Sequence, residues 1–209
     1  MRFFPHTVVG RSFESFLAER ASASTAAAFT AAKRAVEWWQ SVVPSSNGVE
    51  YTGVIDFAQE RCVYNCGTFW KLFAPGRDFI GEPGAWEADA HDGIMCDEPF
   101  WLLELLKATV EAVDEGAQRV GGATWRRYSG RADFGLAQTT AKRRLAAPFG
   151  SDELDLDRLK VEAWIDGTGR IRRAAFHGAR ALTTLDLYEF GNPAPIALPA
   201  PTEILPEES

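Results

Sequence analysis

Residues 97–114 read DEPFWLLELLKATVEAVD, and this stretch decides the fold. Asp97 is a good N-cap, and Pro99 falls in the first turn of a helix, where a missing N–H costs little. The sequence therefore predicts a helix over Asp97–Asp114, closed by Gly116. Its apolar residues form two adjacent stripes, the first with Phe100, Leu103, Leu106, Val110 and Val113, and the second with Trp101, Leu102, Leu105 and Ala112.

The width of this apolar surface determines what must surround the helix. A helix that rests on a flat layer needs an apolar arc of only about 100°. Two adjacent stripes cover a much wider arc, so this helix has to be covered from more than one side. We therefore expect a curved sheet to wrap around it.

Alternating apolar and polar residues predict strands on both sides of the helix. Asp166-Gly167 is the strongest hairpin signal, and Pro83-Gly84 marks another turn. Short turns imply antiparallel pairing, because parallel strands need long crossovers. The fold class is therefore α+β, a curved antiparallel half-barrel sheet wrapped over one or two amphipathic helices. The expected strands are 51–57, 68–73, 78–80, 86–88, 124–136, 139–146, 160–165, 170–174 and 183–190.

The segment before the first strand predicts helix. Apolar residues recur at helical spacing from Phe29 to Val43 after an Ala-rich lead-in, and Pro44 ends the pattern. Ser12 is a candidate cap for a shorter helix before it. We expect one domain over 1–209, with an uncertain segment at 1–23, the half-barrel and helices at 24–192, and a Pro-rich extended tail at 193–209.

The charge of the chain limits its partners. A formal net charge of −7 argues against a nucleic-acid binder driven by phosphate contacts. Between Gln118 and Arg180, however, thirteen Lys and Arg stand against seven Asp and Glu. This basic stretch is either the solvent face of a sheet dressed with arginine or a basic rim for anionic head groups.

Hydropathy gives an expectation about location. No stretch approaches the roughly 18 consecutive apolar residues of a membrane span. The start MRFFPH has too short an apolar run for a signal peptide, and no lipid-modified cysteine follows it. We expect a cytoplasmic protein from the sequence as written, and an exported or membrane-anchored one if a leader precedes it. No particular protein partner is indicated.

Three cysteines and one histidine raise the question of metal or catalysis. Cys62, Cys66, His91 and Cys96 are a weak candidate set for zinc, because the Cys-x3-Cys spacing is permitted but His-x4-Cys is not a familiar module. The alternatives are a Cys62–Cys66 disulfide or free thiols. His91-Asp92 is a candidate base with its orienting carboxylate. The nucleophile-elbow, zinc-protease and phosphate-loop motifs do not occur, so we expect neither an enzyme nor a cofactor.

Several of these segments together resemble an actinobacterial lipoprotein family, the LppX/LprG type, whose fold belongs with the lipoprotein carrier LolA. The resemblance covers roughly residues 24–201 and implies a half-barrel with helices in its mouth, an apolar cavity that carries lipid acyl chains, and no catalytic residues. Its segments are Gly53-Val54-Ile55-Asp56-Phe57, Pro83-Gly84-Ala85-Trp86, Glu98-Pro99-Phe100-Trp101-Leu102-Leu103, Gly121-Gly122-Ala123-Thr124-Trp125-Arg126-Arg127-Tyr128, Val161-Glu162-Ala163-Trp164-Ile165-Asp166, Gly169-Arg170-Ile171-Arg172-Arg173 and Phe190-Gly191-Asn192-Pro193.

The cost of a cavity decides between two functions. A dry apolar cavity costs about 24 cal/mol per Å³, so a pocket of several hundred Å³ costs on the order of 10 kcal/mol. It must hold a ligand or be filled by side chains. We expect a domain that binds a lipid or another apolar small molecule between sheet and helix. The alternative is a cytoplasmic interaction domain filled by its own aromatic residues. The candidate cavity residues are Trp70, Phe79, Trp86, Phe100, Trp101, Leu105 and Phe134.

Overall fold

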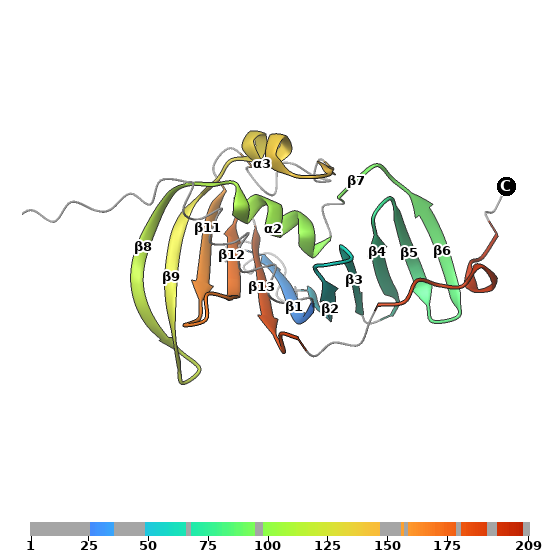
Figure 1. The fold of residues 1–209 in the computed structure, drawn as a ribbon, viewed down its shortest axis with the longest axis horizontal. Helices are drawn as coiled ribbons and strands as arrows, with labels where there is room; N and C mark the ends of the chain where they lie inside the picture. The colour runs from blue at the N-terminus through green and yellow to red at the C-terminus, as the bar shows by residue number, and fades with distance from the viewer. Residues whose placement is uncertain are drawn as a thin grey trace, which may run out of the picture.

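A computed structural model describes residues 26–35, 49–65, 68–94, 98–146, 156, 159–178, 181–191 and 196–206. Its main feature is one antiparallel sheet of eleven strands (Figure 1). The strands are β1 (Ala26–Ala35), β2 (Val49–Asp56), β3 (Arg61–Asn65), β4 (Trp70–Ala74), β5 (Arg77–Glu82), β6 (Ala85–Ala90), β8 (Thr109–Val120), β9 (Ala123–Ala132), β11 (Lys160–Ile165), β12 (Ile171–His177) and β13 (Ala181–Tyr188).

The remaining elements lie outside this sheet. Helices α2 (Pro99–Lys107) and α3 (Phe134–Thr140) both follow the β6 strand in the chain. The two-residue strands β7 (Gly93–Ile94) and β10 (Arg144–Leu145) pair in parallel. A 3-10 turn, η2, spans Pro201–Glu203.

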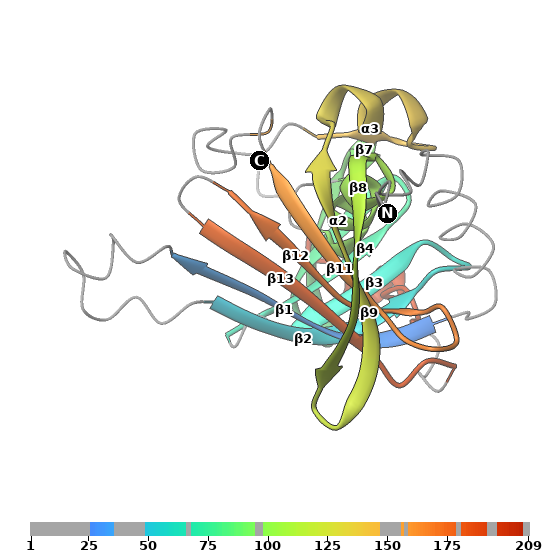
Figure 2. The same cartoon turned by 90° about the vertical axis from the view of Figure 1, so that its left-hand side faces the viewer.

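The strand order explains how the two halves of the chain form one sheet. Across the sheet the order is β6-β5-β4-β3-β2-β1-β13-β12-β11-β9-β8. Pairing of β1 with β13 joins the early strands to the late ones, from Ala28 opposite Tyr188 to Ala35 opposite Ala181. The sheet is curved and unclosed, and α2 lies in its hollow (Figures 1 and 2). The expected α+β class with a curved antiparallel sheet over helices is confirmed.

Two of the predicted turns show why the hairpins form where they do. Gly84, in the turn between β5 and β6, has a φ of 93°, which favours glycine. Between β11 and β12, the carboxylate of Asp166 accepts hydrogen bonds from the backbone N–H groups of Thr168 and Arg170 at 2.9 and 3.0 Å. Both hairpins predicted from these turn residues are confirmed.

The helix predicted from Phe29 to Val43 is wrong over its described part. Ala26–Ala35 is strand β1, which pairs with β2 on one side and β13 on the other. Helix propensity is a weak preference of a few tenths of a kcal/mol per residue. The backbone hydrogen bonds that β1 makes to a strand on each side override this preference. Residues 36–48, and the short helix expected after Ser12, lie outside the described residues.

The helix predicted over Asp97–Asp114 is too long. It ends at Lys107, and Val110, Ala112 and Val113 belong to strand β8. The Oγ1 of Thr109 donates to the backbone oxygen of Leu106 at 2.6 Å, which occupies a carbonyl at the helix end. Gly116 does not close the helix, because it lies at an irregularity in the pairing of β8 with β9. Asp97, the expected cap, is outside the described residues.

Two further strand predictions need correction, and strands β3 and β7 were not predicted. The strand expected over 124–136 ends at Ala132, because the Asp133 carboxylate accepts from the N–H of Leu136 at 2.8 Å and starts helix α3. The strand expected over 139–146 is reduced to β10. Strand β3, between β2 and β4, was not predicted, because Arg61–Asn65 is too short to show a clear alternation.

Candidate functional site

The candidate site is the space between α2 and the concave face of the sheet. Of the nine residues in α2, all except Glu104 and Lys107 are buried. The residues around Leu103 are therefore enclosed on nearly every side, as the sequence predicts. The main apolar cluster joins α2 to strands β2, β3, β4, β9, β11, β12 and β13.

Trp101 anchors α2 in this cluster. Its side chain is fully buried, and its indole Nε1 donates to the backbone oxygen of Ala146 at 2.9 Å. The ring of Phe134, from α3, lies 6.1 Å from it. On another side of the helix, Phe57 meets Phe100 edge to face at 6.3 Å. Sheet, α3 and the segment after β10 thus cover α2 together.

A small recess lies where the end of α2 meets strands β8, β9 and β11. Its volume of about 10 Å³ is room for about one water molecule. Gly130 lets β8 lie close here, because a Cβ on it would meet the Thr109 Cγ2 at 2.5 Å. The lining residues are Leu106, Thr109, Ala112, Tyr128, Ser129, Gly130, Val161 and Ala163.

The seven candidate cavity residues fall on two faces of the sheet. The four from the helices (Phe100, Trp101, Leu105 and Phe134) belong to the main cluster under α2. The three from the strands (Trp70, Phe79 and Trp86) belong to a second cluster, with Leu72 and Ile196. Alternation separates the faces, since Phe73 packs in the main cluster while its neighbour Leu72 packs in the second.

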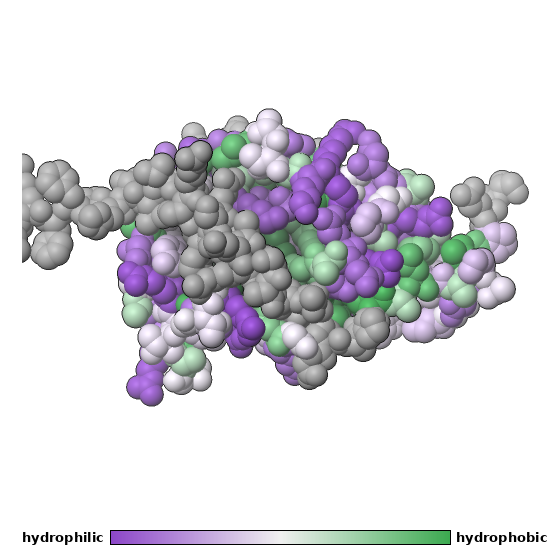
Figure 3. Space-filling view, in the orientation of Figure 1, coloured by the Kyte–Doolittle hydropathy of each residue, from purple (hydrophilic) through white to green (hydrophobic). Residues whose placement is uncertain are grey.

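The second cluster is covered by the chain's own C-terminal segment, residues 196–206. Ile204 forms a parallel bridge with Trp86, and the N–H of Leu205 donates to the Trp86 oxygen at 2.7 Å. The Arg61 guanidinium donates to the Ile196 oxygen at 3.0 Å. Figure 3 shows apolar residues gathered at this end of the molecule, over β4–β6 and the C-terminal segment. Residues 196–206 thus pack against β6 and the second cluster, with the 3-10 turn Pro201–Glu203 within them.

The weak zinc set is only partly within the described residues. Cys62 lies in β3, is fully buried and belongs to the main apolar cluster. His91 follows β6, and Cys66 and Cys96 lie outside the described residues. Asp92 is not the orienting partner of His91, because its carboxylate is 82% exposed and pairs with Arg144 at 3.3 Å.

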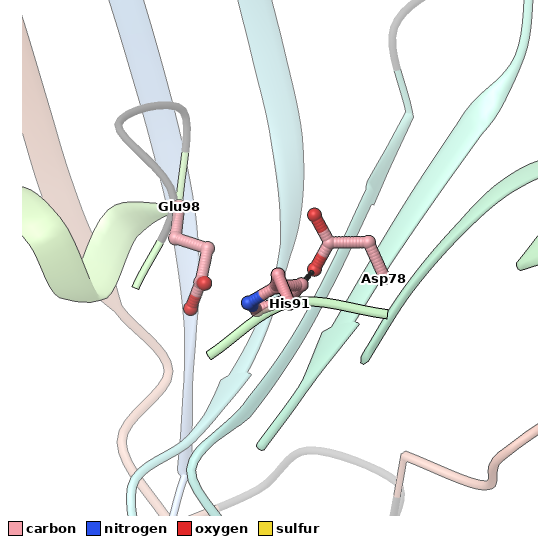
Figure 4. Close-up of side chains that lie close together, drawn as sticks. All are labelled: Asp78, His91 and Glu98. Atoms are coloured by element: carbon pink, nitrogen blue, oxygen red, sulfur yellow. Dashed lines mark hydrogen bonds and ion pairs between the residues drawn. The ribbon is translucent and has the colours of Figure 1, made fainter. Parts of the chain in front are cut away.

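His91 instead lies between two other carboxylates (Figure 4). Its Nε2 is 2.6 Å from the Asp78 Oδ1, and one ligand atom from each of Asp78, His91 and Glu98 lies within 4.8 Å of the other two. The His91 side chain is 10% exposed and Glu98 is 1% exposed. Sequence reasoning singled out His91 but not Asp78 or Glu98, because the three residues come from β5, the segment after β6, and the start of α2.

The opposite face of the sheet carries a compact group of charges around Glu162. Val161 and Ala163 face α2, so Glu162 between them points away from it. Arg127, Lys160 and His177 all contact the Glu162 carboxylate, at 2.5, 2.9 and 3.2 Å. Burial raises the pKa of Glu162, but these hydrogen bonds outweigh it and lower the pKa to about 2.

Much of the basic stretch from Gln118 to Arg180 is engaged within the sheet. Arg173 donates two hydrogen bonds to Asp186, at 2.6 and 3.0 Å, and Arg126 pairs with Asp114 at 2.5 Å. The guanidinium of Arg172 lies over the ring of Phe190 at 5.4 Å. These contacts favour the interpretation that the arginines cover the solvent face of the sheet. They speak against a basic rim that binds anionic head groups.

Comparison with known proteins supports the fold and nothing more specific. No protein-family model and no curated protein matches the chain. The solved structure of the lipoprotein LppX from Mycobacterium tuberculosis is similar, with 10% identity, a TM-score of 0.55, and coverage of 90% of this chain and 99% of that chain. LprF from Mycobacterium bovis is 13% identical, with a TM-score of 0.47 and coverage of 91% of this chain and 97% of that chain.

The class that the fold defines is therefore the LppX-type half-barrel. The likeness to LppX covers most of both chains, so it concerns the fold as a whole. The fold resemblance expected from the sequence is confirmed. Among the described residues, no helix is long and apolar enough to cross a membrane.

Proposed function

We propose that this protein is a non-catalytic binding domain that holds an apolar or lipid-like ligand between α2 and the concave face of the sheet. The observation that carries the proposal is the burial of α2 on nearly all sides, including the two largest side chains Phe100 and Trp101. The fold likeness to LppX, a lipoprotein, supports the same function. The proposed ligand walls are Phe100, Trp101, Leu105 and Phe134.

The close packing under α2 is what such a domain needs when no ligand is bound. A dry cavity of several hundred Å³ costs on the order of 10 kcal/mol, which is comparable with a domain's whole stability. A recess of about 10 Å³ costs only about 0.2 kcal/mol at the same rate. The ligand-free domain therefore closes, and the ligand replaces side-chain contacts as it enters.

The recess is the proposed point of entry. Strand β8 forms one wall and is the last strand of the sheet, so among the described strands it pairs with β9 alone. It can therefore move away from α2 without breaking hydrogen bonds to a strand on each of its edges. The pairing of β8 with β9 already has irregularities next to Val113 and Gly116, and Glu111 has a φ of 56°. A strand edge with such irregularities bends more easily than a strand in the middle of the sheet.

The first experiment asks whether the protein carries a ligand at all. Native mass spectrometry and organic extraction of the purified full chain should reveal a bound apolar molecule. A fluorescent fatty acid should bind with saturation. Absence of both a copurified molecule and fatty-acid uptake would contradict the proposal.

A matched pair of substitutions on β8 tests the place of binding. Ala112 is buried in the recess wall, whereas Ala117 is exposed on the same strand. Overpacking a core position typically costs 1–3 kcal/mol, so Ala112→Leu should weaken fatty-acid binding by about tenfold. Ala117→Leu should leave binding unchanged. Equal affinities for the two variants would place the ligand elsewhere.

The second candidate is an interaction domain whose half-barrel is permanently filled by its own side chains. The complete burial of Trp101 and its hydrogen bond to Ala146 favour this candidate. It predicts no bound lipid and no change in α2 on addition of fatty acid.

The location of the protein in the cell also separates the two candidates. An exported location fits the lipid carrier, and a cytoplasmic location fits the interaction domain. Fractionation of cells that express the full gene distinguishes these locations.

A further inference from the structure

Three residues from separate segments are held together where the β5–β6 hairpin meets the start of α2. Asp78 is opposite Asp89 in the hairpin, and His91 follows the hairpin with its N–H bonded to the Gly76 oxygen at 3.2 Å. Glu98 precedes α2 and its oxygen accepts the N–H of Trp101 at 3.0 Å. Backbone pairing, not side-chain attraction alone, therefore fixes the positions of all three.

The hydrogen bonding of His91 leaves one ring nitrogen unused. The Nε2 atom lies 2.6 Å from the Asp78 carboxylate, so in neutral His91 it carries the proton and Nδ1 carries a lone pair. Nδ1 is buried and has no hydrogen-bond partner in the part of the chain that the structure describes. Figure 4 shows the imidazole between the two carboxylates, with one ring nitrogen facing Glu98. A buried ring nitrogen that faces a carboxylate without a hydrogen bond to it is a place where a metal ion can bind between the two.

The surrounding charges also favour a cation. The Arg143 guanidinium lies 3.4 Å from both Glu98 and Glu60. Lys142 reaches Glu60 at 3.6 Å and is 87% exposed. Glu98 and Glu60 therefore share one guanidinium, and a cation bound beside Glu98 would interact favourably with its carboxylate.

We propose that Asp78, His91 and Glu98 form a binding site for a divalent transition-metal ion of the zinc type. His91 binds the ion through Nδ1 and Glu98 through its carboxylate, while Asp78 holds the imidazole through Nε2, with water completing the coordination. A carboxylate behind a metal-binding histidine is a common arrangement in such sites. Imidazole with carboxylate suits zinc, iron or manganese, and the imidazole disfavours magnesium and calcium.

The dimensions fit a site that closes around the ion. Two ligand atoms bound to one zinc at 2.0–2.2 Å lie about 3.4 Å apart in a tetrahedral site. One ligand atom from each of Asp78, His91 and Glu98 lies within 4.8 Å of the other two, so the groups need to approach by up to about 1.4 Å to reach this spacing. The ion would fasten the β5–β6 hairpin to the start of α2.

Metal titration of the full chain, untagged and treated with chelator, tests the site. Zn²⁺ should bind with a stoichiometry of one in isothermal titration and raise the unfolding midpoint. His91→Gln should weaken Zn²⁺ binding at least about 100-fold, and Asp78→Asn by about 10- to 100-fold. His177→Gln is the matched control, because His177 also pairs with a carboxylate, Glu162, and should leave Zn²⁺ binding unchanged.

Cobalt spectra distinguish this site from one built on cysteine. Co²⁺ bound by nitrogen and oxygen gives no thiolate charge-transfer band, and the double variant Cys66→Ser/Cys96→Ser should bind as the wild type does. A thiolate band, failure to bind Zn²⁺, Co²⁺ and Mn²⁺, or equal Zn²⁺ affinity in His91→Gln would overturn the proposal. If His91→Gln does not fold, the Zn²⁺ affinity of Asp78→Asn and the Co²⁺ spectrum of the wild type test the proposal in its place. Fatty-acid binding is measured separately, so the two proposals fail independently.

Discussion

The two apolar clusters of this sheet lie on opposite faces and are covered in different ways. The main cluster is covered by helix α2, which is anchored by the fully buried Trp101. The second cluster, around Trp86, is covered by an extended segment, residues 196–206. A helix can separate from a sheet as one rigid body and admit a ligand, whereas a segment paired to an edge strand mainly protects that edge. Under the proposed function, the ligand binds on the face beneath α2, and the other face is closed by the chain itself.

The largest expected effect is at the anchor of the main cluster. Trp101→Ala should lower the free energy of unfolding by about 4 kcal/mol, because it leaves a large cavity and removes the hydrogen bond to Ala146. Urea denaturation followed by circular dichroism measures it. A loss under about 1.5 kcal/mol would mean that α2 is not held in the hollow by this residue.

The next effect concerns Glu162, on the face away from α2. Its pKa is lowered from 4.5 to about 2, so its ionised form stabilises the folded state. This contribution is complete above the unfolded pKa of 4.5 and is lost as the pH falls toward 2. At about 1.4 kcal/mol per pKa unit it amounts to roughly 3 kcal/mol.

Comparison with Glu162→Gln isolates this contribution. The difference in unfolding free energy between wild type and variant should be about 3 kcal/mol at pH 7 and should shrink steadily between pH 5 and pH 2.5. A difference that stays constant with pH would show that the carboxylate charge is not what the cluster uses.

A smaller effect is expected where the C-terminal segment covers the second cluster. Ile196→Ala should cost about 2 kcal/mol, since Ile196 is buried in that cluster. Its effect should be non-additive with that of Trp86→Ala, from the same cluster, and additive with that of Trp101→Ala, from the other. A non-additive effect with Trp101→Ala, and an additive one with Trp86→Ala, would contradict the placing of the two apolar clusters on opposite faces.

The smallest effect is expected at an exposed ion pair on β9. Arg126 is 60% exposed and pairs with Asp114 across the β8–β9 hairpin. Exposed pairs contribute little, so the unfolding midpoint of Arg126→Ala should match that of the wild type. Its chain neighbour Arg127 contacts buried Glu162, and Arg127→Ala should lower the midpoint clearly. Similar shifts for the two variants would show that the contact of Arg127 with buried Glu162 contributes no more than the exposed pair of Arg126 with Asp114.

The sequence predicts the fold class well because turn chemistry is local. Pro83-Gly84 and the Asp166 turn place hairpins without reference to the rest of the chain. The Asp133 cap could also have been found, because an Asp three residues before an apolar helix position is a start signal. The β-branched Thr109, Val110 and Val113 favour strand, but their accidental helical spacing extends the predicted helix too far.

Other features depend on contacts that no local pattern records. Ala26–Ala35 is Ala-rich and becomes a strand only because β2 and β13 flank it. The candidate cavity residues show the same limit. These residues are buried or half-buried, but Trp86 and Trp101 pack in different clusters. Asp78 and Glu98 have no sequence signal that joins them to His91, since strand pairing brings them together.

Hydrogen–deuterium exchange with and without a saturating fatty acid tests the central claim most directly. The account predicts that added fatty acid changes the protection of amides in α2, β8, β9 and β11, where the recess lies, and leaves β5, β6 and residues 196–206 unchanged. Unchanged protection throughout, or a change confined to β5, β6 and the C-terminal segment, would contradict a ligand held beneath α2.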